Sequence, residues 1–122
     1  MQDCCETTYR RLMATTRLTP DTIELVAERF RALAEPVRLQ LMNELRGGER
    51  TVGELVEITG LTTGNVSKHL RLLHAAGFVT RRKEGLYVYY EIAGDDVFRL
   101  CDIMCGRIEV ETERRRKAFA RR

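Results

Sequence analysis

The chain has 122 residues, enough for one domain and too few for two comfortable ones. Its hydrophobic content of 43% and charged content of 32% are typical of a globular protein, which argues against disorder. The formal net charge is +3. No stretch approaches the roughly 20 apolar residues of a membrane helix, and the first residues lack the apolar core of a signal peptide. The sequence therefore predicts a cytoplasmic protein without a membrane partner, whose four cysteines are thiols, metal ligands or redox sensors rather than disulfides.

The first half of the chain predicts a polar N-terminal arm, residues 1–19, and then two helices. Thr19 can cap a helix that begins at Pro20, because threonine accepts a hydrogen bond at a helix start and proline suits the first turn. The apolar residues that follow recur at helical spacing: Ile23, Val26, Ala27, Phe30 and Leu33. Pro36 ends this helix and opens the next, which the glycine pair at 47–48 stops.

The stretch 51–77 predicts a second pair of helices around a tight turn. Thr51 and Glu54 have the spacing of a capping box, so a short helix is expected over residues 51–59. Gly60 supplies the turn, and Thr62 caps the helix that follows it. The inward positions of that helix are Val66, Leu70 and Leu73.

A β-hairpin is predicted directly after this pair. Residues 78–82 and 86–92 are rich in β-branched and aromatic side chains, and Lys83-Glu84-Gly85 separate them. We expect Gly85 to adopt a positive φ in the turn.

A long final helix is predicted after residues 94–96, which break the second strand. Its apolar stripe consists of Val97, Leu100, Cys101, Met104 and Ile108. The folded domain is therefore expected over residues 20–118, with a basic tail at 119–122.

The helix that Thr62 caps has a polar face suited to DNA. Nearly all of its outward positions are hydrogen-bond donors or acceptors: Thr63, Asn65, Ser67, Lys68, His69 and Arg71. Short polar side chains let a helix approach base edges in the major groove, whereas Lys and Arg suit phosphates or guanine. The expected tip of the hairpin carries Arg81, Arg82 and Lys83, which suit phosphates or the minor groove. A merely solvated polar face is the alternative, but the turn spacing and the basic hairpin favour DNA binding.

Three segments carry a resemblance to a known family: LAEPVRLQLM, NVSKHLRLLHAAGFV and RRKEGLYVYY. With them, residues 32–92 resemble the winged helix-turn-helix repressors of the ArsR/SmtB (arsenic-repressor) family. The resemblance implies a mainly α fold with a small β-hairpin wing: four helices, two strands and a last helix. It also implies a homodimer, joined through the first and last helices, that represses by binding a palindromic double-stranded operator until an inducer releases it. The implied recognition positions are Asn65, Ser67, Lys68 and His69, and the implied wing is Arg81 to Lys83.

The two histidines have competing interpretations. The resemblance places His69 on the DNA face, whereas a half-buried histidine bonded to a backbone carbonyl is the alternative. His74 lies beyond the reading end of the helix and is expected to be structural. With so few histidines, a zinc site built mainly from imidazole is not expected.

The inducer sites usual in the family are not matched here. One such site uses cysteines in the first helix of the helix-turn-helix, where this chain has Thr51 and Gly53. The other uses an Asp/His/His/Glu set on the last helix, where this chain has Asp102 and Glu109 but no histidine. A sensor in this chain would therefore use other residues.

The four cysteines suggest a different sensor. Cys101 and Cys105 lie four positions apart and so on one helix face, and Cys4-Cys5 form a second pair near the N-terminus. Three sulfurs would suit As(III) or Sb(III), and four would suit Cd(II), Pb(II) or Zn(II), because thiolates select soft ions. The leading hypothesis is a repressor released by a thiophilic metal or metalloid. A thiol redox or persulfide sensor that uses Cys101 and Cys105, and a regulator without cysteine chemistry, stay open.

An enzyme is not expected. Neither histidine stands in a context that suggests a catalytic dyad, and the sequence has no Gly-rich phosphate loop, serine elbow or paired carboxylates that would indicate catalysis or an organic cofactor. A winged helix that binds only protein is the other rival class, but the charged recognition face and wing argue against it.

Overall fold

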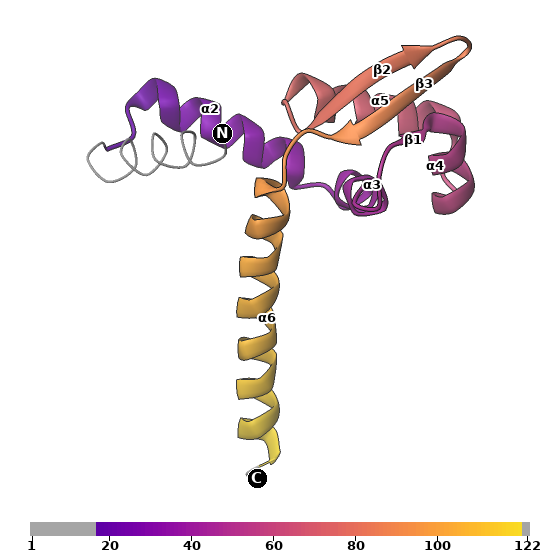
Figure 1. Cartoon of the computed structure of the whole chain (residues 1–122). Helices are drawn as coiled ribbons and strands as arrows, with labels where there is room; N and C mark the ends of the chain where they lie inside the picture. Colours follow the sequence, from indigo (N-terminus) through magenta and orange to yellow (C-terminus); the bar gives the residue numbers. More distant parts are fainter. Residues whose placement is uncertain (1–16, 121–122) are drawn as a thin grey trace.

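The computed structural model describes residues 17–120, and Figure 1 shows the arrangement of their elements. In this part of the chain the helices are α2 (Pro20–Leu33), α3 (Pro36–Leu45), α4 (Val52–Thr59), α5 (Thr63–Ala75) and α6 (Asp96–Ala120). The strands are β1 (Arg50–Thr51), β2 (Val79–Glu84) and β3 (Tyr87–Ile92). The predicted fold class, mainly α with a small hairpin wing, is confirmed.

Local side-chain caps explain where three of the helices begin. Thr19 Oγ1 accepts a hydrogen bond from the backbone N–H of Thr22 at 3.2 Å. Thr62 does the same for Asn65 at 3.2 Å, so both predicted threonine caps are confirmed. For α3, the carboxylate of Glu35 accepts from the N–H of Arg38 at 3.0 Å.

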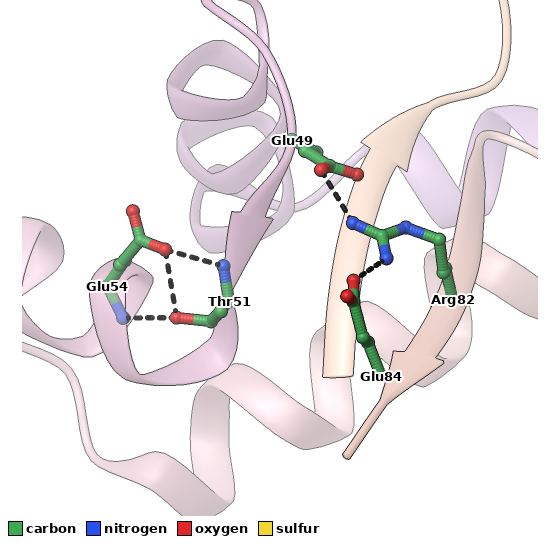
Figure 2. A network of polar contacts seen from close by, with 5 residues as sticks. All are labelled: Glu49, Thr51, Glu54, Arg82 and Glu84. Atoms are coloured by element: carbon green, nitrogen blue, oxygen red, sulfur yellow. Dashed lines mark hydrogen bonds and ion pairs between the residues drawn. The ribbon is translucent and has the colours of Figure 1, made fainter. Parts of the chain in front are cut away.

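The predicted capping box at the start of α4 is also confirmed. The N–H of Glu54 donates to Thr51 Oγ1 at 3.1 Å, and the N–H of Thr51 donates to Glu54 Oε1 at 3.2 Å (Figure 2). Two backbone donors that the helix leaves unpaired are thereby satisfied reciprocally. Thr51 is 9% exposed, so water cannot easily replace these bonds.

The core lies where α3, α4 and α5 meet the sheet. Its buried residues are Leu41, Met42, Leu45, Leu55, Val66, Leu70, Leu73, Val79, Tyr90 and Val97. The three inward residues predicted for α5 are all 0% exposed. Since they lie at i, i+4 and i+7, a single helix stripe faces the core and the opposite face of α5 is left to solvent.

The sheet differs from the sequence expectation in two ways. Its strand order is β1-β3-β2, and the two-residue strand β1 was not predicted. Strand β2 continues through Lys83 and Glu84, with Glu84 paired to Tyr87, so only Gly85 and Leu86 form the turn. Gly85 has the expected positive φ, +60°. The expectation that Arg81, Arg82 and Lys83 occupy the hairpin tip is wrong, because strand pairing places them along β2.

Two helices, α2 and α6, expose large apolar side chains. Helix α6 extends away from the rest of the molecule (Figure 1), and of its predicted stripe only Val97 is buried. Leu100, Met104 and Ile108 are exposed on α6, as are Ile23 and Phe30 on α2. Apolar surface of this extent is typical of a protein–protein interface. No helix within residues 17–120 combines the length and apolar character needed to span a membrane.

Replacing Thr51 with alanine tests the capping box. We expect the free energy of unfolding to fall by about 1–2 kcal/mol, because the hydroxyl that caps α4 is lost at a buried position. Urea denaturation followed by circular dichroism, at one fixed protein concentration, measures the change. The matched control is Thr112→Ala at an exposed position of α6, which should not lower stability. If the two variants unfold at the same urea concentration, the capping box does not stabilise the fold.

Candidate nucleic-acid interface

Helix α5 has the two faces that its sequence predicts. Thr63, Asn65, Lys68 and Arg71 are exposed, whereas Ser67 and His69 are half-buried. These six residues lie on the side of the helix opposite its buried stripe, or on its border. A polar helix face that leads with short side chains can approach base edges closely, and its free N-terminal end favours a phosphate.

The turn between α4 and α5 fixes how α5 is presented. Gly60 ends α4 in the left-handed conformation, with φ of +73°, and its N–H donates to the carbonyl of Val56 at 2.9 Å. Thr59 Oγ1 donates to the carbonyl of Leu55 at 2.6 Å and accepts from the N–H of Leu61 at 3.3 Å. The turn is therefore closed by its own hydrogen bonds, and Leu61 packs against the core.

His69 has a partner that neither sequence interpretation included. Its Nδ1 lies 3.2 Å from Nη1 of Arg38, a residue of α3. Because an arginine side chain can only donate, Nδ1 must accept, so the proton of the neutral ring lies on Nε2. Whether Nε2 then donates to DNA stays a prediction. The alternative of a bond to a backbone carbonyl is not what the described residues show.

Arg38 connects α5 to α2. Besides His69, it donates through Nε to the carbonyl of Ala32 at 2.6 Å and through Nη2 to the carbonyl of Arg31 at 3.2 Å. These carbonyls belong to the last turn of α2, which has no helical donors for them. Sequence reasoning missed this role: the LAEPVRLQLM segment contains Arg38, but no spacing rule relates it to a residue 31 positions away.

A second arginine makes a parallel connection. Arg29 of α2 donates through Nη1 to the carbonyl of Ala76, which caps the C-terminal end of α5, at 2.8 Å. The middle and the C-terminal end of α5 are thus held relative to α2. His74, expected to be structural, is exposed near the same end.

The three basic residues of β2 are not equivalent. Arg81 and Lys83 are exposed, and within residues 17–120 neither forms an ion pair. Arg82 instead bonds to Glu49 Oε1 at 2.7 Å and to Glu84, as Figure 2 shows. Its guanidinium also lies 4.4 Å from the ring centroid of Tyr89. The hydrogen bonds that Arg82 donates to Glu49 and Glu84 raise its pKa above the ordinary value, because both carboxylates stabilise the charged form.

The cysteines of α6 are free thiols on one face of the helix. Cys101 is half-buried and Cys105 is exposed. Within the described residues, no group of three or more His, Cys, Asp or Glu is placed to hold a metal. Asp102 forms an ion pair with Arg46, with 3.8 Å between Oδ2 and Nη2. Cys4 and Cys5 lie outside the described residues, so a site of three or four sulfurs would need them or a second subunit.

The recognition helix, the turn before it and the basic hairpin behind it define a winged helix-turn-helix protein. The sequence profile of the bacterial regulatory protein, arsR family, matches residues 35–81. A solved structure with a TM-score of 0.67 is the homodimeric winged helix-turn-helix DNA-binding domain of a possible ArsR-family transcriptional regulator from Mycobacterium bovis. It is 34% identical and covers 78% of this chain and 88% of that one. The chain therefore belongs to the ArsR family, whose members are transcriptional regulators rather than enzymes, and the predicted resemblance is confirmed.

Two further relatives have names that refer to a metal or a metalloid. A probable mercury resistance operon repressor of Streptomyces lividans is 41% identical over 85 residues, which is 70% of this chain and 63% of that protein. The AntR antimony-specific transcriptional repressor is similar at a TM-score of 0.69 and 25% identity, over 84% of this chain and 94% of that one. The matched stretches make up 34%, 63% and 54% of the curated relatives that match first, so the chain spans about a third to two thirds of their length.

The contact between Arg38 and His69 predicts a tautomer. Nitrogen NMR at a pH where the rings are neutral should find His69 protonated on Nε2 in the wild type. In Arg38→Met, the ring loses the donor to Nδ1 and should shift towards the tautomer mixture of an exposed histidine. His74, exposed and the other histidine of the chain, is an internal control that should not change between the two proteins. A wild-type His69 protonated on Nδ1 would rule this contact out.

Proposed function

We propose that this protein is a homodimeric DNA-binding transcriptional repressor that acts on a palindromic double-stranded operator in the cytoplasm. Residues 20–118 would form the DNA-binding and dimerisation domain. The observation that carries the proposal is that α5 turns a row of donors and acceptors outward and is followed by a strand with two exposed basic residues, Arg81 and Lys83. A pattern of short polar groups flanked by positive charge fits base edges flanked by phosphates.

Each residue of the interface has a role that follows from its chemistry. Thr63, Asn65, Ser67 and His69 would contact base edges, since they carry neutral donors and acceptors. Lys68 and Arg71 would contact phosphates or guanine from the exposed side of α5. Arg81 and Lys83 would contact phosphates from the wing.

Dimerisation through α2 and α6 follows from what the single chain leaves exposed. Ile23 and Phe30 on α2 and Leu100, Met104 and Ile108 on α6 would be covered by a second copy. The Mycobacterium bovis domain is itself described as homodimeric. A two-fold axis would place two α5 helices in successive major grooves, about 34–36 Å apart.

A thiophilic metal or metalloid is the proposed inducer. Cys101 and Cys105 offer two sulfurs on one face of α6, and Cys4 or Cys5 of the same or the other subunit would complete a site for As(III), Sb(III), Cd(II) or Pb(II). The names of the two relatives above concern mercury and antimony, both soft elements. Because α6 would lie in the dimer interface, binding there would change the angle between subunits. A coupling of about 1–3 kcal/mol is enough for induction.

A redox or persulfide sensor is the second candidate, favoured by the exposure of Cys105. Helix geometry limits its form, because Cβ atoms four positions apart lie about 5–6 Å apart. A disulfide requires roughly 3.5–4.5 Å between Cβ atoms. A direct bond between Cys101 and Cys105 would therefore distort α6, whereas a longer polysulfide link or a bond between subunits would not.

The salt dependence of DNA binding separates phosphate contacts from base contacts. An operator is first selected from a random-sequence DNA pool with the wild-type protein, and affinities are then measured by fluorescence anisotropy. Lys68→Gln should reduce the slope of log K against log salt by about 0.9 per subunit, or about 1.8 for the dimer, and weaken binding to all sequences alike. Asn65→Ala should keep the slope and lose about 1–3 kcal/mol of discrimination at one base pair.

Lys117→Gln is the matched control, because it removes the same charge in the last turn of α6. It should keep the wild-type slope. An equal loss of slope from Lys117→Gln and Lys68→Gln would contradict a specific role for α5.

Substituting the α6 cysteines tests the inducer. As(III), Sb(III), Cd(II), Zn(II) and a persulfide donor are titrated against the operator complex of the wild type and of the variant Cys101→Ser/Cys105→Ser. We expect a metal or metalloid to release the wild type with a thiolate-to-metal ultraviolet band, and the variant to stay bound. Cys4→Ser/Cys5→Ser should weaken the response if the N-terminal pair supplies further sulfurs. Release of the α6 variant at the same concentration of inducer as the wild type would exclude both thiol mechanisms.

A further inference from the structure

Arg82 crosses the whole sheet. It lies on β2, one edge strand, and its carboxylate partner Glu49 directly precedes β1, the other edge strand. Between them runs β3, on which Tyr89 is the register partner of both Arg82 and Thr51. The guanidinium passes over the Tyr89 ring at 4.4 Å and reaches Glu49 at 2.7 Å. One side chain thus joins strands that do not themselves pair.

The contact between Arg82 and Glu49 links the hairpin to the segment that leads into α4. Glu49 stands two residues before Thr51, the cap of α4, so the contact ends at the start of the helix-turn-helix (Figure 2). Strand β1 has only two residues, so the hairpin is joined to the segment before α4 by few backbone hydrogen bonds. The contact of Arg82 with Glu49 therefore adds a second attachment between the hairpin and the segment before α4, at the same register as β1.

We propose that Arg82 is a positioning residue that fixes the angle of the wing relative to the helix-turn-helix, and not a phosphate contact. This rests on the proposed DNA-binding function. Two carboxylates bond the guanidinium, so the group of Arg82, Glu49 and Glu84 has a net negative charge that does not attract phosphate. Turning Arg82 to DNA would leave both carboxylates unpaired close to a polyanion.

The neighbours of Arg82 are better suited to the phosphates. Successive residues of a strand point to opposite faces, so Arg81 and Lys83 lie on the face away from Arg82. Within the described part of the chain, neither has an acidic partner that would compete with DNA. In the wing, Arg82 would therefore hold the hairpin to Glu49, whereas Arg81 and Lys83 would contact phosphates.

Charge-retaining and charge-removing variants of Arg82 distinguish the two roles. Lysine keeps the charge but cannot bond two carboxylates from a planar group stacked on Tyr89. Arg82→Lys and Arg82→Met should therefore both weaken operator binding about three- to tenfold, with the wild-type salt slope. If Arg82 contacts a phosphate, Arg82→Lys should bind like the wild type and Arg82→Met should lose about 0.9 per subunit, or about 1.8 for the dimer, from the slope.

Substitution of Glu49 gives effects of opposite sign for the two roles. Removing a negative charge near DNA ordinarily tightens binding, so Glu49→Gln should tighten it if Arg82 is freed for a phosphate. The positioning role predicts that Glu49→Gln weakens binding and that adding Arg82→Lys to it costs little more. Glu91→Gln is the control, because Glu91 is an exposed residue of β3 on the same face and has no bonded partner among residues 17–120. It should bind at least as tightly as the wild type.

The attachment itself is measured without DNA. In the free protein, Arg82→Lys should speed amide hydrogen exchange in β1 and β3 while α5 exchanges as in the wild type. Unchanged exchange in β1 and β3, or tighter binding by Glu49→Gln, overturns the positioning role. A wild type that selects no DNA but shows the expected exchange would instead refute the proposed function and leave the attachment supported.

Discussion

Burial of one stripe of α5 is the constraint on which the rest of the structure depends. Val66, Leu70 and Leu73 are all completely buried between α3, α4 and the hairpin. Moving side chains of this size out of water contributes about 1.5–3 kcal/mol each, so α5 cannot turn about its axis without a large loss. The helical period then places Asn65 and Lys68 outward. The same apolar contacts that form the core therefore select the side chains offered to DNA.

Apolar packing fixes the face of α5, but polar contacts between distant segments fix its angle to its neighbours. Arg38 binds the end of α2 to His69, and Arg29 binds α2 to the end of α5. Arg82 holds the wing to Glu49. In a dimer joined through α2 and α6, these bonds would carry a change of subunit angle to the recognition helix. Hydrogen bonds depend on the direction of donor and acceptor, so a movement of one bonded segment would move the other. Hydrophobic contacts have no such directional requirement.

Local features could be predicted from the sequence, and features that depend on distant partners could not. The capping box at Thr51 and the inward stripe of α5 were predicted because both are set by residues within two turns of a helix. Strand β1 was missed because two residues are too few to show the alternation of apolar and polar side chains that indicates a strand. The basic residues of β2 were placed at the tip because the turn was expected to be longer, and the partner of Arg82 lies 33 positions away. The spacing of Cys101 and Cys105 gives a shared face, but it does not identify a third ligand.

The central proposal is geometric: the two α5 helices of a dimer would lie in successive major grooves of one DNA site. Chemical footprinting of the selected operator tests it most directly, because methylation of guanine N7 reports on the major groove. We expect two protected stretches on one face of the DNA, with centres about 10–10.5 base pairs apart, each lost when Asn65 and Lys68 are replaced. A single protected stretch, or protection confined to the minor groove, would contradict the account.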